Sequence, residues 1–480
     1  MDTLASYDEL PYDSLPLPET QPDFLAAVAK LHGFDAPDPE CVGVELSRVQ
    51  AEAGADFIRH LGLSNIRIVH GDLAALPADL GEFDYIIAHG VFSWVPPAIQ
   101  RALLDVCRRH LAPHGVAYVS FNVTAGWARL MPLRTALIER TAADLAAPER
   151  FAEARRVLTE LEAEWTDPVL LKEIAYLKSA APSYLFHEYL AEFNTPTRFA
   201  EFAAQLDDHG LRYVGEAGPR HAVVELEDAW GLIPESMAGR WLDAEAALDE
   251  AHAIRFRRAL IARADAPCAQ PPQADALRQL AFHADLRSDD EIDLEAMGEQ
   301  AFVNPAGGAY PVAHPAMKAA AMILSAAYPA ALTYPELLAS IKHAMTDYDA
   351  TGNFDETVFR NALFPLVMAH GVTPSVDTMP SATEPIDRPR AHSLARLQAT
   401  SPGWTVSGAR HVALELDAPG RILLSLLDGN RTLDELAIVL RNVLADAGYE
   451  QTPETVQAMT HRMVWLFARQ GLLTEPPGPQ

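Results

Sequence analysis

Three ionisable side chains stand where short apolar segments end, and their spacing could serve to bind a polar ligand. Glu45 and Asp72 each close a short apolar run, and His89 follows a third run, Tyr85 to Ala88. Runs of this kind are typical of strands buried on both faces of a parallel sheet, which bind ligands outside the carboxyl ends of their strands. An acid there can accept hydrogen bonds from ribose hydroxyls or an exocyclic amine, so the pattern favours a nucleotide-type cofactor. Either acid could instead simply cap the helix that follows it.

The elements that would position these side chains alternate between strands and helices. Strands are expected over residues 41–45, 65–69, 83–88, 116–121 and 211–215, and helices over residues 22–31, 48–60, 98–111 and 199–209. This alternation predicts an α/β fold with a doubly wound, Rossmann-like sheet. The turn from His89 to Trp94 follows the most apolar of these strands, so a site is expected there first.

Four segments of this region are similar to one family. They are Tyr7 to Tyr12, Val42 to Ser47, Phe83 to Pro96, and Gly115 to Asn122 with Gly126-Trp127. They resemble the S-adenosylmethionine-dependent methyltransferases that carry a methyltransferase regulatory domain, a group that includes bacterial protein-lysine methyltransferases. The resemblance implies a methyltransferase sheet, S-adenosylmethionine as the cofactor, and a protein or small molecule as the substrate.

The resemblance also assigns cofactor contacts to residues of this chain. Glu45 would bind the ribose, Asp72 would face the adenine, and His89 and Gly90 would line the methionine end of the cofactor.

A second group of residues, Tyr12, Trp94, Asn122 and Trp127, is expected to form the catalytic pocket. Methyl transfer from a sulfonium is a direct displacement, so the protein mainly aligns the reacting atoms. A lysine nucleophile must also be neutral, which a desolvated aromatic pocket encourages, and aromatic faces attract cations. Ordinary core packing is the alternative explanation for each aromatic side chain.

One strand-helix unit of the family pattern is missing from the sequence. A first strand and a Gly-rich turn are expected about 20 to 30 residues before the ribose acid. Here the segment Gly33 to Glu40 leads directly into Cys41. The close approach that a glycine turn allows has no substitute, so impaired cofactor binding is expected. A natural deletion and a mis-defined coding region would both give this sequence.

The chain is expected to continue into mainly helical domains after the sheet. The predicted parts are a methyltransferase-like domain at 1–216, with an N-terminal arm at 1–22 and a helical cap insertion at 129–182; a helical regulatory segment at 217–315, with its clearest helix from Trp241 to Ile261; a winged-helix-like unit at 316–375; a linker at 376–414; and a second winged-helix-like unit at 415–480.

An internal repeat supports the last of these predictions. Thr333-Tyr334-Pro335-Glu336 matches Thr432-Leu433-Asp434-Glu435, and both are capping boxes that begin a helix. The expected third helices, 357–370 and 455–470, carry few basic residues. Their positive charge is too small to bind the phosphate backbone of a nucleic acid. Contact with a protein, presentation of a substrate or formation of a homodimer is the favoured role.

Composition and charge restrict the partners and the compartment. The 480 residues carry a net charge of −29, which opposes nucleic-acid binding and favours a cationic partner, although it could serve solubility alone. No apolar run is long enough to span a membrane, and no signal peptide is recognised at Met1. Three widely spaced cysteines fit a reducing cytoplasm. The run His187 to Ala191 lacks the second histidine of a zinc signature, so no metal is expected.

Three functions therefore remain open at the level of the sequence. The first is a methyltransferase, and the second is a non-catalytic relative that serves as a scaffold or regulatory protein. The third is a nicotinamide-dependent oxidoreductase, which ranks last because the chain contains no Gly-x-Gly-x-x-Gly.

Overall fold

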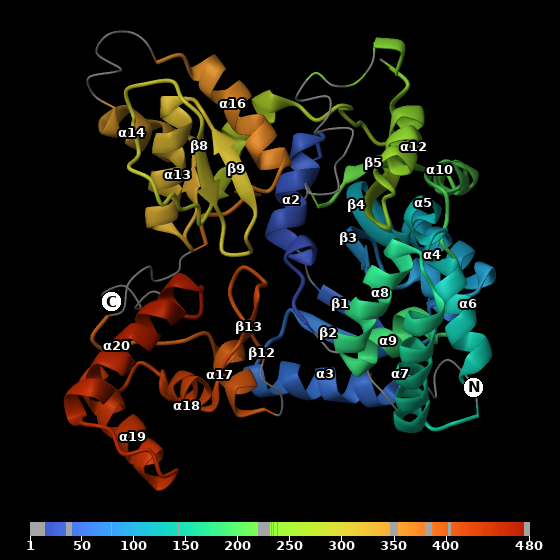
Figure 1. The fold of residues 1–480 in the computed structure, drawn as a ribbon. Helices are drawn as coiled ribbons and strands as arrows, with labels where there is room; N and C mark the ends of the chain where they lie inside the picture. Colours follow the sequence, from blue (N-terminus) through green and yellow to red (C-terminus); the bar gives the residue numbers. More distant parts are fainter. Residues whose placement is uncertain are drawn as a thin grey trace. The chain divides into compact units, whose positions relative to one another are not determined.

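The computed structural model divides the chain into two compact units (Figure 1). It describes residues 15–34, 41–77, 79–142, 144–218, 231, 233, 235–237, 239–345, 354–379, 386–401 and 405–474. Unit 1 consists of Met1–Ser14 and Phe34–Gln270, and unit 2 consists of Leu15–Gly33 and Pro271–Gln480. Unit 1 thus extends beyond residue 216, where the first domain was expected to end.

The strands of unit 1 form two separate sheets. They are β1 (Cys41–Glu45), β2 (Ile66–His70), β3 (Phe83–Ala88), β4 (Leu111–Asn122), β5 (Leu211–Glu216) and β6 (Phe256–Arg263). In the first sheet β1 pairs in parallel with β2, and in the second the order is β3-β4-β6-β5. β3 and β4 are parallel, whereas β6 runs antiparallel to both of its neighbours.

The division between the two sheets lies where the doubly wound order requires one more strand. In the order 3-2-1-4-5-6 the first strand separates the second from the fourth. β2 and β1 correspond to strands 3 and 2 of this order, and β3 and β4 correspond to strands 4 and 5. Within the described ranges, no strand joins β1 to β3. This pairing is what a sheet without its first strand would have. The exposed apolar side chains of unit 1 include Leu46, which follows β1, Val49, and Ile87 of β3.

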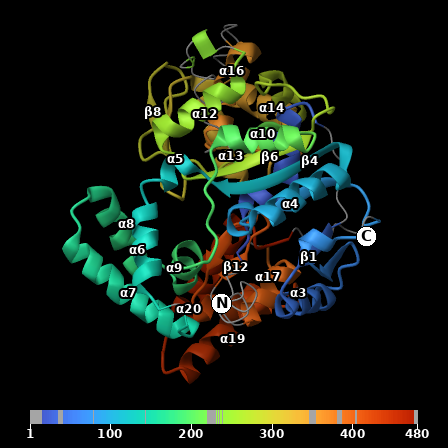
Figure 2. The same cartoon turned by 90° about the vertical axis from the view of Figure 1, so that its right-hand side faces the viewer.

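The helices of unit 1 form a layer on the four-stranded sheet and a separate bundle. They are α3 (Arg48–Leu61), α4 (Pro97–His110), α5 (Thr124–Trp127), α6 (Met131–Arg140), α7 (Ala147–Glu164), α8 (Pro168–Ser179), α9 (Pro182–Tyr189), α10 (Phe199–Asp208) and α12 (Trp241–His252). Alternate residues of β4, Ala117, Val119 and Phe121, share one buried cluster with α4 and α10. Helices α6 to α9 pack on one another around a second core, and Figure 2 shows α6, α7 and α8 side by side.

The prediction of a helix from Trp241 to Ile261 is wrong in its second half. Helix α12 ends at His252, and Ala253 adopts a left-handed conformation with φ 49°. Residues Phe256–Arg263 then form β6, which is inserted between β4 and β5 and buries Ala259 to Ala262 completely. Helix-favouring alanine, leucine and arginine are overridden here because the sheet buries them. The segment 217–315, expected to be helical, also contains three strands of unit 2.

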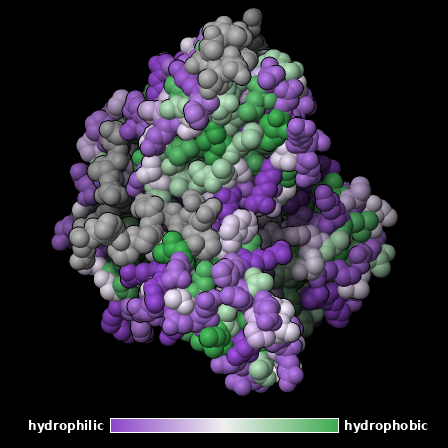
Figure 3. Space-filling view, turned by 90° about the vertical axis from the view of Figure 1, so that its left-hand side faces the viewer, coloured by the Kyte–Doolittle hydropathy of each residue, from purple (hydrophilic) through white to green (hydrophobic). Residues whose placement is uncertain are grey.

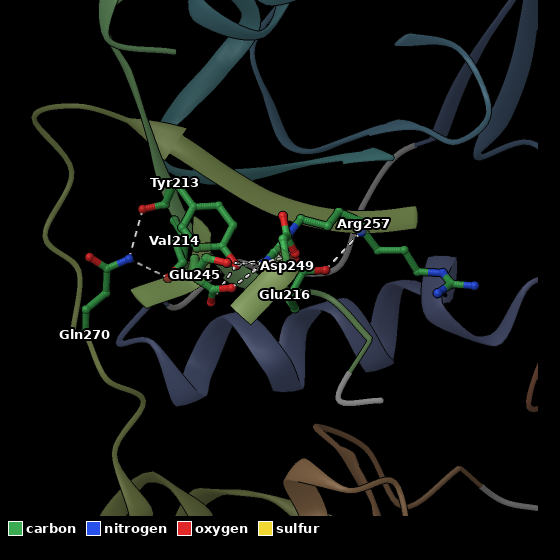
Figure 4. Close-up of polar contacts among 8 residues, drawn as sticks. Tyr213, Val214, Glu216, Glu245, Asp249, Arg257 and Gln270 are labelled. Carbon is green, nitrogen blue, oxygen red and sulfur yellow. Dashed lines mark hydrogen bonds and ion pairs between the residues drawn. The ribbon is translucent and has the colours of Figure 1, made fainter. Parts of the chain in front are cut away.

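Arg257 of β6 is fully buried and joins three elements of unit 1 (Figure 4). Its guanidinium lies 2.7 Å from Glu216 of β5 and 2.8 Å from Asp249 of α12, and it also pairs with Glu245 of α12. The Tyr213 hydroxyl donates to Glu216 at 3.2 Å and to Glu245 at 3.3 Å. Three carboxyl groups thus face one cation, and burial raises the pKa of Glu245 to about 7.

Unit 2 contains two winged-helix-like units in succession. The first consists of β7 (Ala281–His283), β8 (Gln300–Val303), β9 (Ala309–Val312), α13 (Pro315–Ala327), β10 (Leu332–Thr333), α14 (Tyr334–Ala344), α16 (Glu356–Met368) and β11 (Thr373–Ser375). The second consists of α17 (Ser393–Thr400), β12 (Thr405–Ser407), β13 (Ala413–Glu415), α18 (Ala418–Leu426), α19 (Leu433–Asp446) and α20 (Pro453–Arg469).

The order of the elements repeats between the two units. Each has a strand hairpin, β8-β9 or β12-β13, then a helix, a capped helix and a third helix. The central strand β7 pairs with β10 and β11, and in the second unit isolated bridges join Arg390 to Asp428 and Ala391 to Leu473. The capping boxes Thr333/Glu336 and Thr432/Glu435 are both formed. The second unit begins near residue 386, so the span 376–414 is not only a linker: it contains α17 and β12.

Both winged-helix-like units keep some apolar side chains exposed. Met322 of α13 and Val358 of α16 are exposed in the first, and Ile438 of α19 and Trp465 of α20 in the second. Hydrophobic residues also lie among hydrophilic ones on the face that Figure 3 presents.

The helix α2 (Pro22–Leu31) belongs to unit 2, although it lies near the start of the chain. The helix expected at residues 22–31 is confirmed, and its side chains Phe24, Leu25 and Val28 are buried. The Asp23 carboxylate accepts hydrogen bonds from the Ser375 hydroxyl at 2.6 Å and from two backbone N–H groups that follow β11. It also lies 3.4 Å from the Arg410 guanidinium, so α2 contacts both winged-helix-like units.

We predict that Arg257→Leu strongly destabilises unit 1. The substitution leaves Glu216, Glu245 and Asp249 buried without their cation, which costs about 3–5 kcal/mol of unfolding free energy. Urea unfolding of the purified chain measures this loss. The control is Arg240→Ala, which removes an exposed ion pair to Asp243 and should cost about 0–1 kcal/mol. Equal losses for the two variants would contradict a stabilising role for the buried cation.

Candidate active site

The two strand-end acids each use one carboxylate oxygen to hold a local turn. Glu45 Oε1 accepts the Ser47 N–H at 2.7 Å, and Asp72 Oδ1 accepts the Ala74 N–H at 2.8 Å. The alternative capping role is therefore present for Asp72, which caps the 3-10 helix Leu73–Ala75, and not for Glu45, because Ser47 caps the helix that follows it. For the second oxygen of each acid, the described part of the chain supplies no donor. One acceptor oxygen per acid thus remains for a ligand.

The parallel pairing of β1 and β2 brings these acids to one edge. Glu45 is in register with His70, and the Gly71 N–H donates to the Glu45 carbonyl at 3.0 Å. Asp72 follows directly, so the acids lie at the carboxyl ends of adjacent strands. Glu45 is partly buried, whereas Asp72 is exposed.

His89 lies at the corresponding end of β3, in the other sheet. Its Nδ1 forms a hydrogen bond with the Tyr118 hydroxyl at 2.7 Å, and the two rings stack at 5.8 Å. Phe256 packs edge-on against the His89 ring at 5.7 Å. Gly90 has φ +67° and donates its N–H to Ser120 Oγ at 2.8 Å, so β4 fixes the start of this turn. Strand pairing does not connect this turn to Glu45.

The turn after His89 is anchored to the carboxyl end of β4. Its short 3-10 helix, Phe92–Trp94, places the buried Ser93 so that Oγ accepts the Asn122 N–H at 2.8 Å. Trp94 stays partly exposed, as a pocket-lining aromatic requires. Asn122 is buried, and its Nδ2 donates to Asn194 Oδ1 at 3.0 Å. The Ser93 hydrogen bond thus joins the turn that carries Trp94 to Asn122, and a pocket shared by Trp94 and Asn122 stays a prediction.

One of the other two expected catalytic residues packs into a different core. Trp127 belongs to the core of the helical bundle, where its ring lies 5.7 Å from that of Tyr189. The Tyr189 hydroxyl in turn donates to Glu173 at 2.7 Å. Ordinary core packing therefore accounts for Trp127. Tyr12 lies outside the described residues.

Two polar side chains of unit 1 were not identified as candidates from the sequence. Asn194 lies 72 positions from its partner Asn122, and no local pattern marks such a pair. Glu188 of α9 is partly buried in apolar surroundings, and burial raises the pKa of its carboxyl to about 7. To expect this raised pKa from the sequence, one would have to know how the helices of the cap insertion pack around Glu188.

The described residues contain neither a metal-binding cluster nor a membrane-spanning helix. No group of three or more His, Cys, Asp or Glu side chains there could hold a metal ion. None of the helices in these ranges has the length and apolarity needed to cross a membrane.

Three protein families match parts of the chain. Residues 13–115 match the family described as methyltransferase domain. Residues 181–263 match the predicted methyltransferase regulatory domain, and this span contains both β5 and β6. Residues 387–462 match the family described as PKMT, C-terminal winged helix domain.

Two proteins of Rickettsia prowazekii are similar to part of the chain. The uncharacterized protein RP789 of Rickettsia prowazekii is 33% identical over 242 residues, which cover 44% of this chain and 44% of that protein. The chain thus aligns with less than half the length of that relative. The uncharacterized protein RP028 of the same organism is 29% identical over 41% of this chain and 92% of its own length.

The fold as a whole is similar to a solved structure. The structure of PKMT2 from Rickettsia typhi superposes with a TM-score of 0.81 at 20% identity, covering 97% of this chain and all of that one. The same protein in complex with AdoHcy gives a TM-score of 0.80.

We predict that Glu188→Gln stabilises the chain at pH 8. A carboxyl whose pKa is raised on folding stabilises the native state fully below its unfolded pKa, and this contribution is lost as the pH rises through about 7. The glutamine cannot ionise, so the variant should melt at a higher temperature than the parent chain at pH 8 and at the same temperature at pH 4. The control is Glu192→Gln, because Glu192 is exposed. A stability difference that does not vary with pH would contradict this assignment.

Proposed function

We propose that this chain, which contains a methyltransferase domain, a methyltransferase regulatory domain and a PKMT winged helix domain, is an S-adenosylmethionine-dependent methyltransferase that acts on lysine side chains of a protein. The observation that carries the proposal is the placement of Glu45 and Asp72 at the ends of parallel strands, each with a carboxylate oxygen to spare. A nucleoside presents the hydroxyls and the amine that such oxygens accept.

The residues present fit part of the cofactor. Glu45 would hold the ribose, Asp72 would face the adenine, and the turn at His89 and Gly90 would line the methionine end. S-Adenosylmethionine, when bound, supplies the methyl group. The break between β1 and β3 removes the strand and turn that would support its carboxylate end, so we propose that the affinity is low, with a Kd above roughly 1 μM.

The chain's own contribution to the reaction would be alignment and desolvation of the acceptor. Trp94 is partly exposed beside the buried pair of Ser93 and Asn122, so an amine placed there meets an aromatic face and a carboxamide. Loss of water around a lysine amine favours its neutral form, which is the nucleophile. Correct orientation of the reacting atoms can supply roughly 7–11 kcal/mol of the barrier.

Charge supports a cationic protein as the partner. The net charge of −29 attracts lysine-rich segments and repels nucleic acid. The arginine of α16, Arg360, is buried and paired with Asp275 at 3.1 Å, while Arg469 of α20 bonds backbone carbonyls and Asp285. Both are engaged within the protein, which leaves Arg462 of α20 as an exposed arginine of these two helices, too little charge for a phosphate-binding surface. We propose that the winged-helix-like units bind protein, either the substrate or a second copy of the chain, in the cytoplasm.

A second candidate function is a non-catalytic scaffold or regulatory protein. The break in the sheet favours this second function, because in doubly wound folds the missing first strand and its turn form part of the cofactor-binding surface. A measurement of cofactor binding distinguishes the two candidate functions, because only the methyltransferase has to bind the cofactor.

We predict that Glu45→Ala weakens cofactor binding by about 1.5–3 kcal/mol, or one to two decades, because a charged acceptor is lost. Isothermal titration calorimetry with AdoHcy measures the change. Asp72→Asn is the matched variant and should cost less, since one acceptor oxygen survives.

Two outcomes would contradict the proposal. Tight binding that does not change in Glu45→Ala would move the cofactor away from these strand ends. The absence of binding at millimolar AdoHcy would favour the scaffold.

A further inference from the structure

The segment that directly follows Asn194 is fixed against the carboxyl end of β4 and the turn at Ser93. The Thr195 N–H donates to the Ser93 carbonyl at 2.8 Å, and the Thr197 N–H donates to the Asn122 carbonyl at 2.9 Å. Thr197 also forms an isolated parallel bridge with Val123. This segment therefore adds a short extended edge beside the turn that carries Trp94, and its position depends on that turn.

Asn194 determines which way the Asn122 carboxamide faces. A carboxamide has one donor end and one acceptor end, and its orientation follows from the hydrogen-bond network. The donor end of Asn122 is used, since Nδ2 donates to Asn194 Oδ1 at 3.0 Å. Its acceptor end, Oδ1, bonds no donor among the residues that the structure describes. Asn122 is thus held with an acceptor oxygen available at a strand end, where ligands of such sheets bind.

Asn194 itself retains a buried donor without a partner. The residue is 8% exposed, and its Nδ2 has no hydrogen-bond partner in the described ranges. Leaving a buried amide donor unsatisfied costs free energy, and a native structure tolerates this where a ligand completes the bond. The two carboxamides therefore offer one free acceptor and one free donor side by side.

We propose that Asn194 is a positioning residue of the methyl-acceptor site. It orients Asn122 so that Asn122 Oδ1 accepts a hydrogen bond from the acceptor amine, and its own Nδ2 donates to an oxygen of the acceptor molecule. The amine keeps its lone pair for the methyl group while one of its N–H bonds points to Asn122. This inference rests on the proposed methyltransferase function and adds which side chains orient the lysine amine.

Methyl transfer to poly-L-lysine tests the positioning role. In Asn194→Leu the orientation of Asn122 is lost, so kcat should fall roughly ten- to hundredfold while the Kd for AdoHcy stays within about twofold. Asn194→Asp keeps an oxygen that accepts from Asn122 Nδ2, so it should recover part of kcat. Asn361→Leu is the control, because Asn361 is exposed on α16 of unit 2. Unchanged kcat in Asn194→Leu, an equal loss of AdoHcy affinity, or no transfer to poly-L-lysine by a parent chain that binds AdoHcy would overturn the inference.

Thermal unfolding gives a readout that does not depend on activity. If the pair is kept for a ligand, replacing both carboxamides by leucine removes an unsatisfied donor, and Tm should rise or stay unchanged. A fall in Tm of several degrees would assign the pair to structure and overturn the inference. A parent chain that does not bind AdoHcy would instead refute the proposed function, and the unfolding result would still decide the role of the pair.

Discussion

The buried guanidinium of Arg257 is the interaction on which unit 1 depends. It is surrounded by carboxyl groups from β5 and α12, and it also packs 4.4 Å above the Phe199 ring of α10. Buried charges persist only when they are paired, so this one cation fixes where β5, β6 and α12 can lie. The segment that matches a regulatory domain is therefore not a separate domain. It supplies β5 and β6, two of the four strands in the sheet that also positions His89 and Asn122.

The break in the sheet restricts the site in a different way. Glu45 and His89 end strands that no ladder connects, so their relative position depends on helix packing rather than on strand register. Each strand-end acid also spends one oxygen on a local turn. The proposed nucleoside end of the site is consequently built from few groups, whereas the proposed acceptor end is densely bonded through Ser93, Asn122 and Asn194.

Local signals in the sequence predicted much of this architecture. The strand ends at Glu45 and His89 and the capping boxes at Thr333 and Thr432 were identified because neighbouring residues determine them. β6 was mistaken for helix, since its residues favour helix and only burial between two strands makes them a strand. Trp127 was placed in the pocket, although its packing partner Tyr189 lies on a helix 62 positions away. Asn194 could not be found for the same reason: its role depends on a contact with a distant segment.

The position of α2 has a consequence for how the chain is made. Asp23 leaves the ribosome early, but its partners Ser375 and Arg410 follow 352 and 387 residues later. Most of the sequence of unit 1 therefore lies between the two parts of unit 2, as an insertion would. Domains fold in order of synthesis where they can, and closing so long a loop carries an entropic cost that a folded insert reduces. Unit 1 can acquire its structure during translation, whereas unit 2 becomes complete only after the winged-helix-like units have emerged.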